Sequence, residues 1–263
     1  MHLPVDLPIT NIFAPDYLVV LVGALLHVTG QNVCTIRGDG MVVDCTNVKL
    51  SAIPADLLSG LTLDLLLEKN KFSSIPTDQL SAAPNLRFLD LTSNLLTVIS
   101  EDSFRTTPNL KELVIDGNIL LREVHPNAFS HFRNLSRLHL SGAIMTAISP
   151  SHFVPLASLE ELRFGFAPIS HAEIDLFAPL HNIVRVDVAV CGAVSVALAT
   201  HSLGLTTLSR LEYLYVCSAC FEGQRGWGGA AVRTGQGGSR RCGYNVCSSF
   251  HIMSTSIRNL VCN

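Results

Sequence analysis

Cysteines are the residues of this 263-residue chain whose spacing could support either metal binding or disulfide formation. Cys191 stands alone, and the other seven are Cys34, Cys45, Cys217, Cys220, Cys242, Cys247 and Cys262. The pairs at 217/220 and 242/247 have spacings that zinc ligands tolerate, so a zinc site is one alternative. Eight cysteines behind a secretion signal favour disulfides in an oxidising compartment, and we expect no bound metal ion or other cofactor. The sequence leaves the pairing of the last five cysteines open.

Two short motifs could serve a secreted or surface protein. Asn134-Leu135-Ser136 is the one N-x-S/T sequence, and it would be a glycan acceptor in a secreted chain, although Asn134 directly precedes a predicted strand. Arg37-Gly38-Asp39 lies between Cys34 and Cys45, and integrins bind this tripeptide when a constrained loop presents its guanidinium and carboxylate groups. Gly-Asp-Gly at residues 38–40 is also favourable turn chemistry, so a plain polar turn is the alternative.

Catalytic motifs are missing from the sequence. It holds no G-x-S-x-G nucleophile turn, no G-x-x-x-x-G-K-S/T phosphate loop and no H-E-x-x-H zinc helix. The ten histidines are dispersed, and we cannot assemble a nucleophile, a base and an oxyanion donor. A formal net charge of -3 and a pI near 6.3 argue against a protein that neutralises nucleic-acid phosphates. We therefore predict a non-enzymatic protein with no catalytic residues and no nucleic-acid partner.

An uninterrupted apolar run covers residues 18–26. It is shorter than the roughly 20 apolar residues that a membrane helix needs, and with the compact residues that precede Gln31 it predicts a signal peptide over residues 1–30. The upstream segment contains Asp6 and Asp16 but no Lys or Arg, so a buried segment of the folded domain is the alternative. We expect the mature chain to be secreted or extracellular, with no membrane span.

The elements that must position these residues come from a block that recurs about every 24 residues. Its pattern is L-x-x-L-x-L-x-x-N, and its copies start at Thr62, Leu86, Leu110, Leu135, Leu159, Ile183 and Leu211. Such a period is typical of a solenoid, whose units bury their apolar faces only by stacking on their neighbours. Short alternating segments such as residues 89–91 predict one strand per unit, and the stacked strands predict one parallel sheet.

Two columns of the repeat have predicted structural roles. A packed spine along the outer side of the solenoid, rather than a ligand cage, is expected from Leu80, Phe104, Phe129, Phe153 and Phe177. Asparagine side chains that satisfy the turn after each strand are expected at Asn70, Asn94 and Asn118. Later units have Ala or Cys at this position, so their turns must satisfy the backbone by other means.

This pattern resembles the leucine-rich-repeat proteins of the typical extracellular type, whose repeat residues 86–109 match nearly position for position. The resemblance implies an α/β fold, a curved horseshoe solenoid with a parallel β-sheet on its concave side, and about six to seven repeats over residues 62–220. Residues 31–61, through Cys34, Val43-Asp44-Cys45 and Leu50-Ser51-Ala52-Ile53-Pro54, resemble the cysteine-containing amino-terminal cap found in Slit, Nogo receptor, Toll-like receptor ectodomains and variable lymphocyte receptors. This resemblance implies a disulfide between Cys34 and Cys45. Residues 221–263 are rich in Gly and Cys, and we expect a degenerate carboxyl cap or a disordered tail there.

The concave face is the predicted binding surface. Its outward strand positions mix arginines, aromatic residues and carboxylates, which is the composition of a protein interface. The candidate binding residues are Asp90, Asp116, Arg137, His139, Arg163, Phe166, Arg185, Asp187, Tyr213 and Tyr215. We predict an extracellular recognition module for a protein partner, with partner identity and oligomeric state left open. A matrix or adhesion protein that uses Arg37-Gly38-Asp39 and an intracellular leucine-rich-repeat scaffold are the alternatives.

Overall fold

The computed structural model describes residues 34–144, 148–166, 175–190, 203–218 and 246–251, and the structural statements below concern these residues. The predicted signal peptide at residues 1–30 and Cys191 lie outside them. So does the predicted carboxyl cap or tail, apart from the strand Val246–His251.

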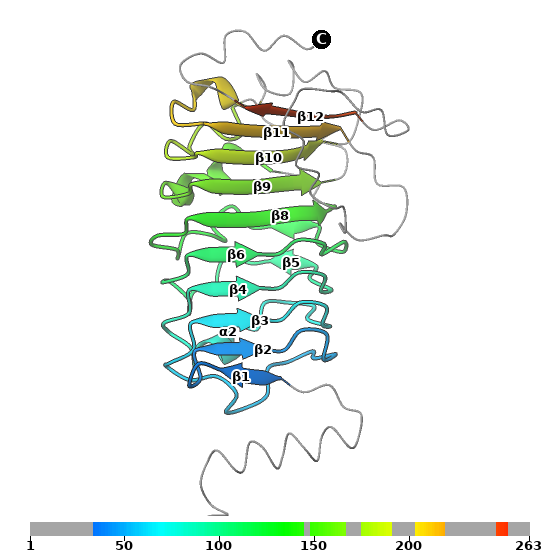
Figure 1. The fold of residues 1–263 in the computed structure, drawn as a ribbon, viewed down its shortest axis with the longest axis vertical. Coiled ribbons are helices and arrows are strands. Elements are labelled where there is room, and N and C mark those ends of the chain that lie inside the picture. Colours follow the sequence, from blue (N-terminus) through cyan, green and yellow to red (C-terminus); the bar gives the residue numbers. More distant parts are fainter. Residues whose placement is uncertain (1–33, 145–147, 167–174, 191–202, 219–245, 252–263) are drawn as a thin grey trace, which may run out of the picture.

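One ten-stranded sheet extends through the described chain, with strands stacked like rungs (Figure 1). In order across the sheet, its strands are β1 (Thr35–Arg37), β2 (Val42–Asp44), β3 (Asp64–Leu66), β4 (Phe88–Asp90), β6 (Glu112–Val114), β8 (Arg137–Ala143), β9 (Glu161–Phe166), β10 (Arg185–Val190), β11 (Tyr213–Ser218) and β12 (Val246–His251). Neighbours from β2 to β11 are parallel, whereas β1 and β12 pair antiparallel at the two edges. The predicted solenoid of stacked parallel strands is confirmed.

The segments between these strands return behind the sheet with little helix (Figure 1). They contain α2 (Thr77–Leu80), 3-10 turns at Pro150–His152, Val154–Leu156 and Leu205–Thr207, and the paired strands β5 (Val98–Ile99) and β7 (Glu123–Val124). Each repeat therefore has one long rung on the sheet side and an irregular return on the other.

The strand register stacks equivalent apolar residues on one another. One column of successive Cα partners contains Leu65, Leu89, Leu113, Leu138, Leu162, Val186 and Leu214. Every member of this column is fully buried, and so are the residues that start the predicted repeats. The core is thus shared between units, and no repeat could bury it alone.

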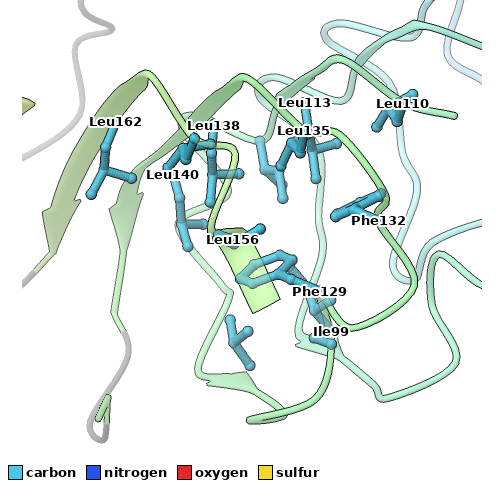
Figure 2. Packing of buried hydrophobic residues seen from close by; sticks show 14 of the residues in the cluster. Ile99, Leu110, Leu113, Phe129, Phe132, Leu135, Leu138, Leu140, Leu156 and Leu162 are labelled. Atoms are coloured by element: carbon cyan, nitrogen blue, oxygen red, sulfur yellow. The ribbon is translucent and has the colours of Figure 1, made fainter. Parts of the chain in front are cut away.

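Phenylalanines fill the part of the core next to the return segments (Figure 2). All five residues of the predicted spine are fully buried. The ring centroids of Phe104 and Phe129 lie 6.3 Å apart, and those of Phe153 and Phe177 lie 5.2 Å apart. Figure 2 shows Phe129 beside Ile99, so the aromatic column packs on the second, smaller sheet. The spine is core rather than a ligand cage.

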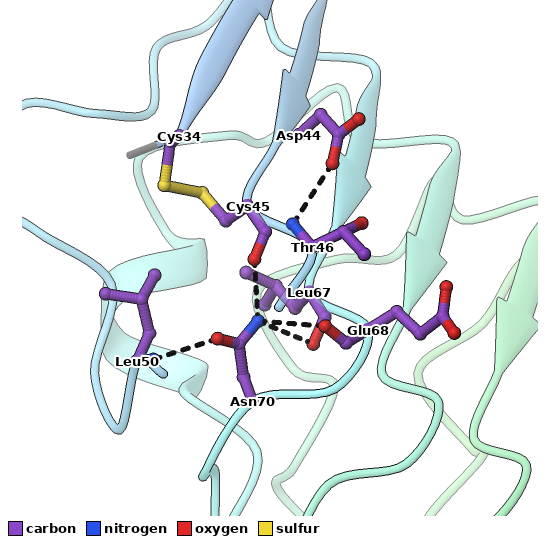
Figure 3. Close-up of a disulfide and its surroundings, with 8 residues drawn as sticks. All are labelled: Cys34, Asp44, Cys45, Thr46, Leu50, Leu67, Glu68 and Asn70. Atoms are coloured by element: carbon purple, nitrogen blue, oxygen red, sulfur yellow. Dashed lines mark hydrogen bonds between the residues drawn. A yellow bond between two sulfur atoms is a disulfide. The ribbon is translucent and has the colours of Figure 1, made fainter. Parts of the chain in front are cut away.

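Buried asparagines connect the first repeats. The side-chain oxygen of Asn70 accepts from the backbone amide of Leu50 at 2.8 Å, and its nitrogen donates to the carbonyls of Cys45 and Leu67 at 2.7 and 3.0 Å (Figure 3). Asn94 and Asn118 repeat this arrangement one and two units later. These side chains satisfy backbone groups that water cannot reach.

Asn70, Asn94 and Asn118 form what is called the asparagine ladder here, and the strands become longer where this ladder ends. Ala143 occupies the next ladder position, and β8 runs through it for seven residues, whereas β3, β4 and β6 have three residues each. β9 continues to Phe166, which is the Cα partner of Ala143. Longer strands thus supply, through the sheet, the backbone hydrogen bonds that asparagine side chains supply in the earlier units.

A disulfide joins Cys34 to Cys45 at the amino-terminal edge, as the resemblance implied (Figure 3). The hairpin of β1 and β2 lies between the two cysteines. Val43 and Cys45 are buried, and β2 pairs with β3 in parallel. This hairpin therefore covers the apolar edge of the first repeat.

Candidate binding surface

The face of the ten-stranded sheet that points away from the leucine core is called the outer sheet face here. It corresponds to the concave face of the sequence analysis. Its side chains are set by strand alternation: in β4, fully buried Leu89 lies between half-buried Phe88 and Asp90, which point outward. Because inward leucines hold every strand, the outward side chains start from fixed backbone positions.

The parallel register brings most of the predicted binding residues into two neighbouring rows. The first row contains the successive Cα partners Arg137, Glu161, Arg185 and Tyr213. The second contains Asp90, Val114, His139, Arg163, Asp187 and Tyr215. Asp116 lies two residues after the end of β6. The candidate set thus gathers over β4 to β11, although its members are up to 125 positions apart in the sequence.

Phe166 is the last residue of β9, and it is the Cα partner of Ala143. The side chains of Phe166 and Tyr215 lie outside what the structure describes.

Arg163 stands between two carboxylates on neighbouring rungs. Its Nη1 lies 3.4 Å from Oδ2 of Asp116, and its Nε lies 3.9 Å from Oδ2 of Asp187. Asp116 is fixed by Ser141, whose backbone amide and hydroxyl donate to Oδ1 at 2.8 and 2.6 Å. Ser141 was missing from the predicted set. Aligning the repeats would have found it, because it lies one unit after Asp116 in the same column.

Glu161 is the centre of a second group of charges. Its Oε2 lies 3.3 Å from Nη1 of Arg185, and its Oε1 lies 3.6 Å from Nε2 of His139. The Arg185 guanidinium also lies 5.4 Å from the centre of the Tyr213 ring, which is a cation–π contact. The arginines of this region are therefore matched by carboxylates and a ring from adjacent rungs.

Arg137 makes the remaining arginine contact of the first row. Its Nε donates to Oε2 of Glu112 at 2.7 Å, and this hydrogen bond raises the pKa of Arg137 above its ordinary value. The pair is largely exposed on the arginine side. Such pairs contribute about 0–1 kcal/mol to stability, so the network orients side chains more than it holds the fold.

The amino-terminal part of the outer sheet face carries the carboxylates Glu68, Asp90 and Asp116, and Nζ of Lys69 lies 2.6 Å from Oε1 of Glu68. Asp90 lies near Glu68 and Asp116, and it has no ion-pair partner among the described residues. Burial raises the pKa of Asp90 above its ordinary value, hydrogen bonds from Thr92 oppose this, and the two neighbouring carboxylates add to the rise. The half-buried apolar side chains of this part of the face are Leu66, Phe88 and Val114.

Two polar atoms in the middle of the outer sheet face lack a hydrogen-bond partner within the described part of the chain. They are Nε2 of His139 and Oδ1 of Asp187, and both are shielded from water. Burial raises the pKa of Asp187, and the nearby charge of Arg163 opposes the rise. A buried polar atom without a hydrogen-bond partner costs stability, so the middle of this face is less well satisfied than its surroundings.

A groove of about 550 Å³ follows the edge at which the strands begin. Its apolar lining includes Met41 and Leu61, whose exposed fractions are 47% and 63%. Arg87 and Lys111 line it from successive repeats, and Asn134, the predicted glycan acceptor, borders it. This edge joins the outer sheet face to the amino-terminal hairpin.

The Arg37-Gly38-Asp39 motif forms the exposed turn between β1 and β2. Gly38 and Asp39 have φ values of +61° and +54°, in the left-handed region that glycine and aspartate tolerate in tight turns. Nη2 of Arg37 lies 3.0 Å from Oδ2 of Asp44, so its guanidinium is engaged inside the hairpin. The structure thus presents Asp39 at the turn but holds Arg37 back along the strand.

The proposed zinc ligands are only partly described. Cys217 and Cys247 are Cα partners in β11 and β12, whereas Cys220, Cys242 and Cys262 lie outside the described segments. Among the residues that the structure describes, no group of three or more His, Cys, Asp or Glu side chains could hold a metal ion. Within the same segments, no helix has the length and apolar character needed to cross a membrane.

Comparison with known proteins identifies similar repeats. A family model for the leucine rich repeat matches residues 59–120 and 108–165. Leucine-rich repeat-containing protein 3B of Bos taurus is 33% identical over 106 residues, which are 40% of this chain and 40% of that protein. Toll-like receptor 2 type-1 of Gallus gallus is 34% identical over 109 residues, which are 41% of this chain and 14% of the receptor. The chain thus matches less than half the length of either relative.

A solved structure extends the comparison to the fold. The crystal structure of human trophoblast glycoprotein superposes with a TM-score of 0.54, and the match covers 69% of this chain and 68% of that one. The sequence identity is 22%, so this likeness concerns the arrangement of the strands alone.

Proposed function

We propose, from the premise that this chain is a leucine-rich-repeat protein that resembles the Toll-like receptor ectodomains, that it is a non-enzymatic recognition module whose outer sheet face binds a protein partner. One observation carries the proposal. Charged side chains on β8, β9 and β10 stand in register and form one continuous surface around Arg163, Glu161 and Asp187.

The charges favour a partner that presents basic and apolar side chains. A cationic group beside Asp90 would compensate the charge of this carboxylate, whose pKa is raised first by burial and then by Glu68 and Asp116. Leu66 and Phe88 offer apolar contact area next to it. In the centre, Arg163 and Asp187 offer the partner a half-exposed guanidinium and a carboxylate from neighbouring rungs.

The size of the surface sets a second requirement. Seven strands about 4.8 Å apart span about 29 Å, and five residues of strand extend about 17 Å, which gives roughly 500 Å². A standard interface buries about 800 Å² on each partner. A tight complex would therefore also contact loops beyond the strands.

We further propose that the protein acts outside the cell, with residues 1–30 removed as a signal peptide. The disulfide between Cys34 and Cys45 supports an oxidising compartment, because such bonds are rare in the cytosol. The test is the intact mass of the protein from a secretory host. A chain that stays in the cell, keeps Met1 and has eight free thiols would refute this part.

Binding is tested with the secreted, tagged protein on an array of purified extracellular proteins, followed by affinity measurement for each hit. We expect Asp187→Lys and Asp90→Lys to raise Kd at least about tenfold, which is about 1.4 kcal/mol. Arg105→Glu is the matched control, because Arg105 pairs with exposed Asp78 on the return side. Unchanged affinity in both outer-face variants, with loss in the Arg105 variant, would place the interface elsewhere.

Cell attachment through Arg37-Gly38-Asp39 is the second candidate function. The exposed turn at Asp39 favours it, whereas the contact of Arg37 with Asp44 opposes it. If attachment is the function, Asp39→Ala abolishes adhesion of cells to the immobilised protein, and Asp187→Lys leaves it intact. Adhesion that survives Asp39→Ala excludes this candidate.

A further inference from the structure

Several repeats carry an asparagine directly before their first apolar position. These residues are Asn85, Asn109, Asn134 and Asn182, and all of them are exposed. Three of them tie neighbouring repeats together, because their Nδ2 atoms donate to the carbonyls of Gly60, Pro84 and Ala157 at 2.9, 3.0 and 2.8 Å. Asn134 makes no such side-chain hydrogen bond within the described residues.

The local backbone explains why Asn134 differs. The unit from Leu110 to Leu135 is one residue longer than the unit before it. The carbonyl of Pro108, the equivalent of Pro84, accepts at 3.2 Å from the backbone amide of Arg133. A backbone amide thus donates to this carbonyl in place of an asparagine side chain, and the Asn134 amide is left to the solvent.

We propose that Asn134 carries an N-linked glycan at the edge where the strands begin. The inference rests on the extracellular location proposed above. Asn134 is the asparagine of the one N-x-S/T sequence, it is exposed, and the next residue, Leu135, is buried at 2% exposure. A glycan on this side chain extends away from the core and breaks no contact between repeats.

The modification needs a donor that the secretory pathway supplies, namely an oligosaccharide on a lipid pyrophosphate. A bond forms between Nδ2 of Asn134 and the anomeric carbon of the first sugar. The bond from that carbon to the pyrophosphate oxygen breaks, and the pyrophosphate leaves with the electron pair. Nδ2 loses one proton and keeps the other, so the product is a secondary amide.

The glycan would occupy one side of the binding surface. Asn134 borders the groove lined by Met41 and Leu61, and it lies three residues before Arg137 on β8. A partner of the outer sheet face would then approach from the opposite edge, at which the strands end.

The experiment compares intact masses of the full chain from a secretory host before and after treatment with an amidase that removes N-glycans. We expect one N-glycan in the wild type, and aspartate in place of asparagine at position 134 after treatment. Asn134→Gln and Ser136→Ala should each lose the glycan, whereas Ser136→Thr should keep it.

Asn109→Gln is the matched control, since Asn109 occupies the same repeat position outside any N-x-S/T sequence. It should keep the glycan. Asn134→Gln should be secreted and melt at the wild-type temperature, because this side chain makes no hydrogen bond in the described chain. A secreted protein with unmodified Asn134 overturns this inference alone. A chain retained in the cytosol with free thiols overturns the extracellular proposal on which it rests.

Discussion

Asn94 and Asn118 are both buried asparagines of the ladder, but the structure predicts different stability costs for replacing them by alanine. In Asn94, Oδ1 accepts from the amide of Phe72, and Nδ2 donates to the carbonyls of Leu67 and Leu91. Those carbonyls keep a second donor when Asn94 is lost, because Asn70 also donates to Leu67 and Asn118 to Leu91. Asn94→Ala therefore leaves one buried group, the Phe72 amide, without a hydrogen-bond partner.

Asn118 is the last member of the ladder, and no described asparagine of a following repeat donates to the Ile115 carbonyl. Its Oδ1 accepts from the amide of Leu96, and its Nδ2 donates to Ile115. The next ladder position holds Ala143, which cannot donate to Ile115. Asn118→Ala therefore leaves two groups without a hydrogen-bond partner, the Leu96 amide and the Ile115 carbonyl, at a site with no solvent exposure.

The structure turns this count into a difference in unfolding free energy. Each buried group without a hydrogen-bond partner costs about 1–3 kcal/mol. We therefore expect the unfolding free energy to fall by about 1–3 kcal/mol for Asn94→Ala and by about 2–6 kcal/mol for Asn118→Ala. For a domain of this size, a difference near 2 kcal/mol separates the melting temperatures by about 4–8 °C.

The assay is urea and thermal unfolding of the two variants, followed by circular dichroism. Asn109→Ala is the control, because Asn109 is exposed and makes one bond to Pro84. It should cost no more than about 1.5 kcal/mol. Equal losses for Asn94→Ala and Asn118→Ala, or a larger loss for Asn94→Ala, would refute the argument that the end of the ladder carries the extra cost.

Three further outcomes are expected. Leu113→Ala should lower the unfolding free energy by about 2–5 kcal/mol, whereas Leu120→Ala, at an exposed site, should change it by less than about 0.5 kcal/mol; similar losses in thermal melts would contradict the shared core. Asp90→Asn should stabilise the protein at pH 7, because the pKa of Asp90 is raised in the folded state and its charged form is disfavoured there. In urea titrations, this gain in unfolding free energy should shrink as the pH falls through the raised pKa towards 3.8. A gain that does not change with pH would exclude titration of Asp90 as the cause. Replacing both Cys34 and Cys45 by Ser should cost about 3 kcal/mol in the chain-entropy account, and a reductant should destabilise the wild type but not the variant.

The fold was predictable because its signal is repeated. A single L-x-x-L-x-L is weak, but the column from Leu65 to Leu214 recurs every 24 to 28 residues, and register in a parallel sheet then follows from stacking. The length of the strands was not predictable in the same way. β8 to β11 extend beyond three residues because Ala143 and its successors cannot bond the turn, and the sequence reveals this only as a missing asparagine.

The outer sheet face was predictable as a set of residues but not as a network. Alternation places Arg163 and Asp187 outward, whereas the contact of Arg163 with Asp116, 47 positions earlier, depends on side-chain reach across two rungs.

The reversed strands at both edges have a consequence for solubility. A stack of parallel rungs is a template that a second molecule could extend without limit, as happens in fibrils. In the described sheet, the two edge strands are β1 and β12, whose direction opposes the rest of the stack. Neither edge therefore offers a second molecule the parallel register by which the repeats themselves are stacked.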